Sequence, residues 1–456
     1  MKLVSRNPYT GQVMEEFEAM TFDDTVREIQ KSRQAFLQWK KTSVEERAGY
    51  LRAISKRLRD QQRTFAETIT REMGKPIGQS LAEIEKCAWL VDHFTGNSSK
   101  ILQEEIVETD ALKSYVAFEP LGIILGIMPW NFPFWQVFRF AIPALMAGNV
   151  CLLKHASNVP STALTIENLF KDSGVPDHVF KTLLVDSQAA MQLIERELVD
   201  GVSLTGSVEA GSQIASLAGR HIKKFVLELG GSDPFIVLED ADIPKAARMA
   251  LQARMINSGQ SCIAAKRFIA MTAIARPFME ALEREINTVK IGDPMDPATT
   301  IGPLAKQEFV GVLSGQLEDA QRKGARVVYG PPPPSGKGFF FRPAMVSHVQ
   351  PGMRILTEEV FGPIMPVLVA QSEEDLVGIA NTSAYGLGAS IWTRDLIGAE
   401  RLARNLEAGF IAVNDMVKSD PRLPFGGIKK SGIGRELSHY GMKEFVNIKS
   451  VVIKGA

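Results

Sequence analysis

Short β-rich runs alternate with helical stretches from residue 116 onward. Strands and helices follow one another over residues 123–127, 134–146, 150–154, 161–171 and 182–185. After Glu228 the alternation resumes, with a strand over 235–238, a helix over 243–255 and a strand over 267–271. Such alternation is typical of parallel sheets, because neighbouring parallel strands need a helical crossover between them. The sequence therefore predicts an α/β fold with two α/β domains.

Three other segments complete this prediction. Residues 21–94 have helical periodicity, and a capping box at residues 43–46 opens a second helix there. Residues 330–336 contain four consecutive prolines, which remove four backbone donors and favour an exposed loop. Residues 445–453 read as a strand near the C-terminus.

Composition narrows the class of protein. The 456 residues are 45% hydrophobic, enough for two or three packed domains, and they contain 52 basic and 52 acidic residues. With no excess of basic charge, we expect no nucleic-acid partner and no binding to an anionic membrane surface. Proline, asparagine and arginine interrupt the most apolar stretch, 121–153, so we expect no membrane span. Residues 1–20 lack the apolar core of a signal peptide.

The three cysteines, Cys87, Cys151 and Cys262, are too few for a disulfide framework, and no pair of ligands has metal-binding spacing. We therefore expect a cytoplasmic protein without a metal. Cys87 on an amphipathic helix and Cys151 in an apolar strand suit buried thiols. Cys262 ends a small polar turn, residues 257–262, in which a thiol could be reactive, although a small buried hydrophobe is the commoner role of a free cysteine.

Two polar side chains follow apolar strands. Glu228 ends such a run before two glycines, and it is either a general base or an ordinary surface carboxylate at a turn. Asn131 lies in residues 129–133 (Pro-Trp-Asn-Phe-Pro), where its amide could donate to an oxyanion.

A turn that enters a helix could bind a phosphate. It contains Thr205, Gly206, Ser207 and Gly211, and its backbone amides together with the helix N-terminus suit a pyrophosphate, although such turns also simply start helices. Lys154 ends the strand at 150–154, at the edge where α/β sheets bind ligands. Its alternative is a surface lysine.

Five segments in the same order, 129–133, 205–207, 228–231, 259–262 and 359–363, resemble the aldehyde dehydrogenase superfamily from about residue 5 to residue 456. The resemblance implies a Rossmann-like cofactor domain, an α/β catalytic domain and a β-rich oligomerisation arm. It also implies that Cys262 is the nucleophile, that Glu228 is the general base, and that Asn131 and the Cys262 backbone N–H form the oxyanion hole.

The same resemblance assigns cofactor residues. Lys154 would bind the adenosine ribose, and Glu359 the nicotinamide ribose, with Phe361 packed beside the nicotinamide. Without the resemblance, Phe361 would be assigned to the core. The helix-entry turn would hold the pyrophosphate, and Trp130 and Leu229 would complete the site.

Two positions depart from the family pattern. Ser157 stands where many NAD-preferring members have glutamate, which would repel a 2′-phosphate, so we expect NADP as the preferred cofactor and NAD as the alternative. His155 replaces the more usual proline, and the sequence offers no account of its effect.

The substrate prediction depends on Arg139. Asn131, Trp135 and Arg139 are spaced four apart and share a face if their helix starts early, and Arg139 then suits the carboxylate of a short aldehyde acid. A structural cation paired with an interface carboxylate is the alternative. Residues 128–139, 154–157 and 426–432 resemble the shorter bacterial succinate semialdehyde dehydrogenases. That likeness implies that Arg139 binds the substrate carboxylate with help from Ser419, whose alternative is an ordinary loop hydroxyl, and that Trp135 and Ser261 belong to the same site.

These observations predict NADP-dependent oxidation of succinate semialdehyde to succinate through a thiohemiacetal and a thioester on Cys262. The alternative is a broader NAD(P)-dependent dehydrogenase of short aldehydes. A CoA-acylating enzyme would not need Glu228, and a binding protein would not need the reactive residues.

The domains also follow from the resemblance. The expected cofactor domain comprises residues 1–103 and 119–229, the catalytic domain 230–415, and the arm 104–118 and 437–456, with 416–436 returning to the active-site side. An arm strand that a second subunit can cover predicts a homo-oligomer, with dimer and tetramer both open.

Overall fold

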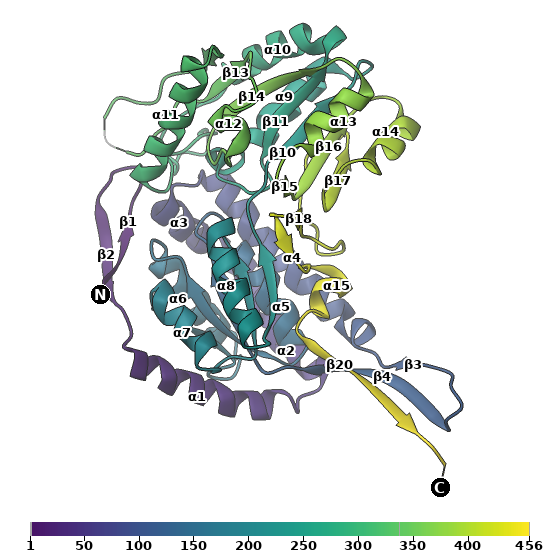
Figure 1. The fold of residues 1–456 in the computed structure, drawn as a ribbon. Helices are drawn as coiled ribbons and strands as arrows, with labels where there is room; N and C mark the ends of the chain where they lie inside the picture. The colour runs from purple at the N-terminus through teal and green to yellow at the C-terminus, as the bar shows by residue number, and fades with distance from the viewer. Residues whose placement is uncertain (1, 337, 456) are drawn as a thin grey trace.

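The computed structural model describes residues 2–336 and 338–455 (Figure 1). A six-stranded sheet lies in the lower half of Figure 1 and is parallel except for its short edge strand β19. Its strands, in spatial order, are β19 (Gly432–Ile433), β9 (Lys224–Glu228), β8 (Gly201–Thr205), β5 (Ile123–Met128), β6 (Val150–His155) and β7 (Phe180–Thr182). The helices of this half are α1 (Phe22–Trp39), α2 (Val44–Asp60), α3 (Gln62–Met73), α4 (Ile77–Ile101), α5 (Trp135–Met146), α6 (Pro160–Asp172), α7 (Ser187–Glu195) and α8 (Val208–Arg220).

A seven-stranded sheet lies in the upper half and is parallel except for edge strand β12. Its strands, in spatial order, are β12 (Arg326–Tyr329), β13 (Ala344–Ser347), β14 (Ile364–Ala370), β11 (Ala265–Met271), β10 (Asp233–Val237), β16 (Gly388–Trp392) and β17 (Phe410–Val413). Its helices are α9 (Ile243–Met255), α10 (Thr272–Ile286), α11 (Gln307–Arg322), α12 (Arg354–Thr357), α13 (Glu373–Asn381) and α14 (Leu396–Ala403). The predicted α/β fold is confirmed.

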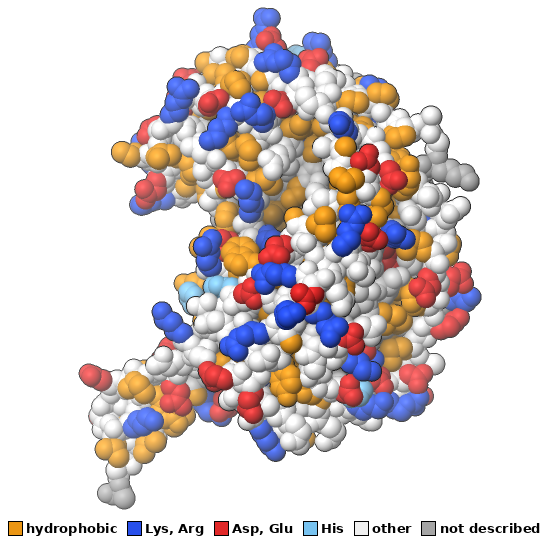
Figure 2. All heavy atoms as spheres, turned by 180° about the vertical axis from the view of Figure 1, so that it is seen from behind, with side chains coloured by type: hydrophobic (Ala, Val, Ile, Leu, Met, Phe, Trp, Pro, Cys, Tyr) orange, Lys and Arg blue, Asp and Glu red, His pale blue; other side chains and the backbone are white. Residues whose placement is uncertain are grey.

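Short elements connect and extend the two halves. They are the hairpin of β1 (Lys2–Arg6) and β2 (Val13–Glu18), the pair of β15 (Tyr385–Gly386) and β18 (Ile428–Lys429), and helix α15 (Ser438–Met442). A separate sheet of β3 (Glu105–Ile106), β4 (Lys113–Pro120) and β20 (Val446–Ile453) forms an arm that stands away from the body in Figure 1. Hydrophobic side chains gather on this arm in Figure 2, and Ile106, Leu112 and Val452 are among the exposed ones.

Most predicted elements form, with shifted ends. The capping box at Ser43 is present, and residues 330–336 form neither helix nor strand. The strand expected at 182–185 is wrong: β7 ends at Thr182, and the next residues lead to Asp186, whose side chain accepts from Ala189 N and caps α7. Within the described residues, no helix is long and apolar enough to cross a bilayer.

Helix α5 begins later than the early start considered above. Glu83 Oε1 accepts hydrogen bonds from the backbone N–H groups of Phe134 and Trp135, 2.9 Å each, and so fixes the N-terminus of this helix. Asn131 therefore precedes the helix, while Trp135 and Arg139 lie one turn apart on it. The carboxylate of Glu83 also pairs with the buried Lys75.

Candidate active site

A cavity of about 190 Å³ lies between α4, α5, the Cys262 turn and the loop after β17. It brings together five residues that the sequence singled out, which are Trp135, Arg139, Ser261, Cys262 and Ser419. These four elements belong to different parts of the chain, so the cavity exists only in the folded protein.

The turn that carries Cys262 is held in a constrained conformation. Asn257 and Ser258 both have positive φ, 51° and 56°, which non-glycine residues rarely adopt. Lys266 Nζ donates to the carbonyl oxygens of Ser261, at 2.9 Å, and Cys262, at 2.6 Å. Lys266 is almost completely buried, and sequence reasoning missed its role. The turn therefore holds the thiol at a fixed position.

Cys262 is partly exposed and forms no disulfide, whereas Cys87 and Cys151 are buried as expected. Desolvation raises the pKa of the Cys262 thiol to about 12, with Arg139 and Lys266 opposing the shift and Glu359 and Glu228 adding to it. At neutral pH the sulfur of the free protein therefore carries its proton, and a base must remove that proton before the sulfur can attack.

Asn131 is buried, and its amide is held at both ends. Its Nδ2 donates to Gln260 O at 3.1 Å, and its Oδ1 accepts from Gln136 Nε2 at 3.0 Å. Its backbone carbonyl accepts from Asn257 Nδ2 at 2.7 Å, which ties the Asn131 turn to the Cys262 turn. One N–H of the Nδ2 group is left to donate to another acceptor.

The structure shows what His155 does at the position where the family usually has proline. Its Nδ1 lies 3.1 Å from Met128 O and 3.0 Å from Ala156 N, and its Nε2 lies 3.0 Å from Pro133 O. Burial lowers the pKa of His155 to about 4, so the ring is neutral and can donate its one N–H to one of these two carbonyl oxygens. The imidazole thus braces the end of the turn that holds Asn131.

Glu228 ends β9 and is buried with its carboxyl group unbonded. Neither oxygen has a hydrogen-bond partner among the described residues. Desolvation raises the pKa of Glu228 well above its ordinary value, and the neighbouring Glu436 raises it further, whereas Arg139 and Arg435 lower it. A buried carboxyl with a raised pKa and free oxygens is suited to proton transfer.

Arg139 forms a structural ion pair, one of the two alternatives that the sequence left open, and it also lines the cavity. Its Nε lies 2.6 Å from Glu436 Oε2, so it is paired with a buried carboxylate. The pair is close in distance but poorly directed for a hydrogen bond, and Nη2 has no partner among the described residues. The guanidinium stacks over the ring of Phe425, with 4.7 Å from Cζ to the ring centroid, and it lines the cavity. Sequence reasoning missed Glu436, which lies 297 positions along the chain from Arg139.

A second cation faces this cavity. Lys86 on α4 donates from Nζ to Ser419 Oγ at 2.8 Å, and Ser419 itself is almost fully buried. Sequence reasoning missed Lys86, because a lysine on an amphipathic helix is ordinarily a solvated residue.

The helix-entry turn lies at the carboxyl end of the six-stranded sheet, where α/β folds bind ligands. Ser207 caps α8 by accepting from Ala210 N at 3.2 Å. Thr205 Oγ1 is buried and has no hydrogen-bond partner in the part of the chain that the structure describes. Leu229 packs so closely on Gly211 that a Cβ at that position would lie 2.5 Å from its side chain, while Gly206 N donates to Glu228 O at 3.0 Å. The unpartnered hydroxyl and the helix N-terminus fit a phosphate-bearing cofactor.

Lys154 and Ser157 lie at the end of the neighbouring strand β6. Lys154 is buried; desolvation lowers its pKa, and the negative charge of Asp186 opposes the shift. Ser157 is exposed in the turn that follows the strand. An exposed hydroxyl beside a buried ammonium group fits the ribose end of a dinucleotide.

Glu359 and Phe361 lie on the other side of the Cys262 turn. Glu359 Oε1 accepts from Gly231 N at 3.1 Å and pairs with Lys266 Nζ at 3.2 Å. Trp130 stacks on Phe309, with centroids 5.1 Å apart, and meets Phe361 edge-on at 5.9 Å. Lys266 therefore links Glu359 to the turn that carries Cys262.

Comparisons with known proteins agree on one family. The aldehyde dehydrogenase family pattern matches residues 1–451. A probable NADP(+) succinate-semialdehyde dehydrogenase of Synechocystis is 43% identical, covering 99% of this chain and all of that protein. The NAD(P)+ succinate semialdehyde dehydrogenase Sad of Escherichia coli is 42% identical, covering 98% of this chain and 97% of that protein.

Solved structures give the same result. The crystal structure of succinic semialdehyde dehydrogenase from Streptococcus pyogenes, in complex with NADP+, superposes with a TM-score of 0.97 at 35% identity, covering 99% of this chain and all of that one. Together with the arrangement of Cys262, Glu228 and Asn131, these matches show that the chain belongs to the aldehyde dehydrogenase family.

Proposed function

We propose that the protein oxidises succinate semialdehyde to succinate with NADP as the oxidant. The observation that carries this proposal is the single cavity that Cys262, Arg139, Lys86 and Ser419 all line. A thiol suits an aldehyde, and two cations, the buried Arg139 and the partly buried Lys86, together with a hydroxyl suit a carboxylate at the other end of the same molecule. The names of the Synechocystis, E. coli and S. pyogenes relatives support the same substrate.

In this proposal Cys262 adds to the aldehyde carbon, forming a C–S bond and a thiohemiacetal. Asn131 Nδ2 and the Cys262 backbone N–H donate to the oxygen as it becomes negative. Gln136 Nε2 and Gln260 O hold the Asn131 amide in one orientation and leave one N–H of Nδ2 to donate to the substrate oxygen. Because burial raises the pKa of Cys262, the sulfur must lose its proton as it attacks, and Glu228 is the unbonded carboxyl close enough to influence that pKa.

When bound, NADP would supply the oxidant: the thiohemiacetal carbon would lose a hydride to it and the hydroxyl would lose its proton, which would leave a thioester on Cys262. Glu228 then takes a proton from the water that attacks the thioester, and succinate departs as the C–S bond breaks. Desolvation and Glu436 raise the pKa of Glu228, while Arg139 and Arg435 lower it, so the two arginines oppose the shift and favour the carboxylate form that this step requires.

The residues proposed to hold NADP form two groups. Thr205, Gly206, Ser207 and Gly211 hold the pyrophosphate, with Leu229 packed behind them, while Lys154 and Ser157 bind the adenosine ribose. Glu359, Phe361 and Trp130 hold the nicotinamide end. Ser157 offers a hydroxyl where a carboxylate would repel a 2′-phosphate, and this favours NADP, with NAD as the alternative cofactor.

A direct assay tests the proposal. The purified protein is incubated with succinate semialdehyde and NADP, with and without CoA, while NADPH absorbance is followed. We expect NADPH formation that does not require CoA and a kcat/KM for succinate semialdehyde well above that for butanal. Equal use of both aldehydes would favour the broader aldehyde dehydrogenase, and strict dependence on CoA would favour an acylating enzyme.

The proposal extends to assembly and location. The arm of β3, β4 and β20 exposes Ile106, Leu112 and Val452, and pairing of this arm with a second subunit would cover them as a homo-oligomer, a dimer or a tetramer. The domain boundaries predicted above belong to this proposal. Three unpaired cysteines support a cytoplasmic enzyme.

A further inference from the structure

Lys86 is partly buried and lines the substrate cavity. It lies on α4, donates to Ser419 Oγ at 2.8 Å, and places Nζ 4.3 Å from the centroid of the Trp135 ring. The residue is therefore held by two contacts, one to a hydroxyl and one to an aromatic face. Neither contact neutralises its charge.

The nearest carboxylates are engaged with other cations. Glu83, one turn before Lys86 on α4, pairs with Lys75 and caps α5. Asp420, in the loop beside Ser419, pairs with Arg422 at 2.6 Å. No carboxylate lies within 4 Å of Lys86 Nζ among the described residues, so a partly buried ammonium group is left without a direct counterion. Burying a charge without a partner is costly, and a ligand that supplies the opposite charge recovers that cost.

We propose that Lys86 is a second cation of the substrate carboxylate site, acting with Arg139 and Ser419. This inference rests on the proposed function. The ammonium group donates to the Ser419 oxygen, so the Ser419 hydroxyl proton is free to point into the cavity toward a carboxylate. Lys86 thus both contacts the carboxylate and orients the hydroxyl that helps to bind it.

A purely structural role for Lys86 predicts a different effect of its loss on the choice of substrate. If its function were only to hold the loop that carries Ser419, the charge would be dispensable as long as the loop stayed in place, and every aldehyde would be affected alike. If it binds the carboxylate, loss of the charge affects acidic aldehydes selectively. The two roles are therefore separable by substrate chemistry.

The charge on Lys86 also depends on pH within the working range of an enzyme. Burial and the positive charge of Arg139 on α5 lower the pKa of Lys86 to about 8, while Cys87 and Glu83 on α4 and Asp420 in the loop oppose the shift. Below this pH the ammonium form predominates and can bind a carboxylate; above it the neutral amine cannot pair with one. Preference for the acidic aldehyde should therefore fall as pH rises through about 8.

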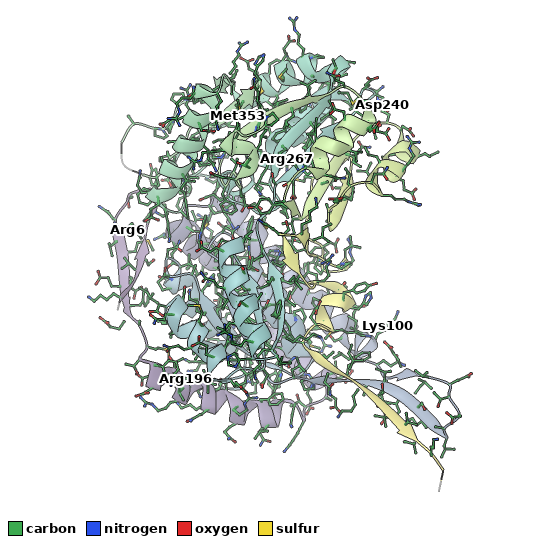
Figure 3. All side chains as sticks on the ribbon, in the orientation of Figure 1. Arg6, Lys100, Arg196, Asp240, Arg267 and Met353 are labelled. Atoms are coloured by element: carbon green, nitrogen blue, oxygen red, sulfur yellow. The ribbon has the colours of Figure 1, made fainter. Side chains whose placement is uncertain are left out.

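The experiment measures the ratio of kcat/KM for succinate semialdehyde to kcat/KM for butanal, from pH 6.5 to 9.5. Butanal has the same number of carbons and no carboxylate, so titration of Cys262 and Glu228 cancels in the ratio. The variants are Lys86→Met, which keeps the length of the side chain without its charge, and Lys86→Arg, which keeps a charge that does not titrate in this range. Lys100→Met is the matched control, since Lys100 is an exposed lysine at the far end of the same helix (Figure 3).

We expect the wild-type ratio to be high at pH 6.5 and to fall above about pH 8. Lys86→Met should lower it about 10- to 150-fold at pH 6.5 and make it independent of pH, as loss of a charge-assisted hydrogen bond predicts. Lys86→Arg should remove the decline above pH 8, and Lys100→Met should behave as wild type. NADP binding, followed by tryptophan fluorescence, checks that each variant is folded.

Two results would overturn the inference while the proposed function stands. One is an equal fall in kcat/KM for both aldehydes in Lys86→Met. The other is a wild-type ratio of the two kcat/KM values that is high but does not change with pH. If the wild-type enzyme shows no preference for succinate semialdehyde at any pH, the proposed substrate itself is wrong and the role of Lys86 fails with it.

Discussion

Glu228 and Gly426 are in close contact: a Cβ on Gly426 would lie 2.6 Å from Glu228 Oε1. Gly426 also has a φ of 153°, a backbone conformation that favours glycine. The absence of a side chain at position 426 therefore leaves the space that the Glu228 carboxyl occupies. This contact joins the end of β9 to the loop that returns from the upper half of the molecule.

Gly426→Ala should displace the Glu228 carboxyl and slow the steps that depend on it. We expect kcat for succinate semialdehyde to fall by at least about 10-fold, since a shift of 1 Å in a catalytic group can cost more than that. Stopped-flow measurement of NADPH formation checks this. An unchanged kcat would show that Glu228 moves aside without loss of function.

Glu228→Gln should separate oxidation from hydrolysis. The first NADPH forms before the thioester is hydrolysed, so we expect a burst of about one NADPH per active site followed by a much slower phase. Quenched samples should contain the acyl enzyme by mass spectrometry. If no burst appears, Glu228 is required earlier, for removal of the Cys262 proton.

Cys262→Ala should abolish turnover and leave the affinity for NADP within a few-fold of the wild-type value. The thiol forms the covalent intermediate, while the cofactor residues proposed above lie on other segments. Isothermal titration with NADP and an activity assay on the same preparation test both parts. Cys151→Ala is the control, because Cys151 is a buried thiol with no place in the proposed chemistry. Turnover near the wild-type level in Cys262→Ala would exclude this mechanism.

Ser157→Glu should reverse the cofactor preference. A carboxylate at the exposed turn after β6 repels a 2′-phosphate and can accept a hydrogen bond from a ribose hydroxyl. We expect kcat/KM for NADP to fall by at least about 10-fold and that for NAD to stay equal or rise. Ser157→Gln is the neutral control, because glutamine has nearly the same size as glutamate, and it should lower kcat/KM for NADP far less. A wild-type protein that already prefers NAD would show that this interpretation of Ser157 is wrong.

The sequence predicted the parts of the site that are local in the chain. Glu228 and the Asn131 turn follow apolar runs, and the ends of parallel strands meet at one edge of a sheet, so their approximate place could be predicted. The helix was predicted over 134–146 and α5 runs over Trp135–Met146, but the residue that fixes its start could not be predicted, since Glu83 caps it from 51 positions upstream. Lys86 and Glu436 were missed for the same reason: only tertiary packing brings them to Arg139, and neither belongs to a local pattern.

Arg139→Ala tests the substrate assignment, and the structure changes what this variant should do. Removing the guanidinium leaves Glu436 without its partner and takes away a positive charge that lowers the pKa of Glu228. The pKa of Glu228 should then rise further, so its carboxylate form would be lost at a higher pH. We therefore expect the acid side of the pH profile for butanal to move to higher pH in Arg139→Ala.

The shift in the pH profile affects every aldehyde. If Arg139 also binds the substrate carboxylate, Arg139→Ala should in addition lower kcat/KM for succinate semialdehyde alone. At a pH above both acid limbs, we expect kcat/KM for succinate semialdehyde to fall about 10- to 150-fold more than that for butanal, because a charge-assisted pair contributes about 1.5–3 kcal/mol. Glu436→Gln is the control, since it breaks the ion pair and leaves the guanidinium facing the cavity. It should not lower the ratio of the two substrates. If the ratio of the two kcat/KM values stays at the wild-type value in Arg139→Ala, Arg139 only pairs with Glu436 and lowers the pKa of Glu228, and the substrate carboxylate binds elsewhere.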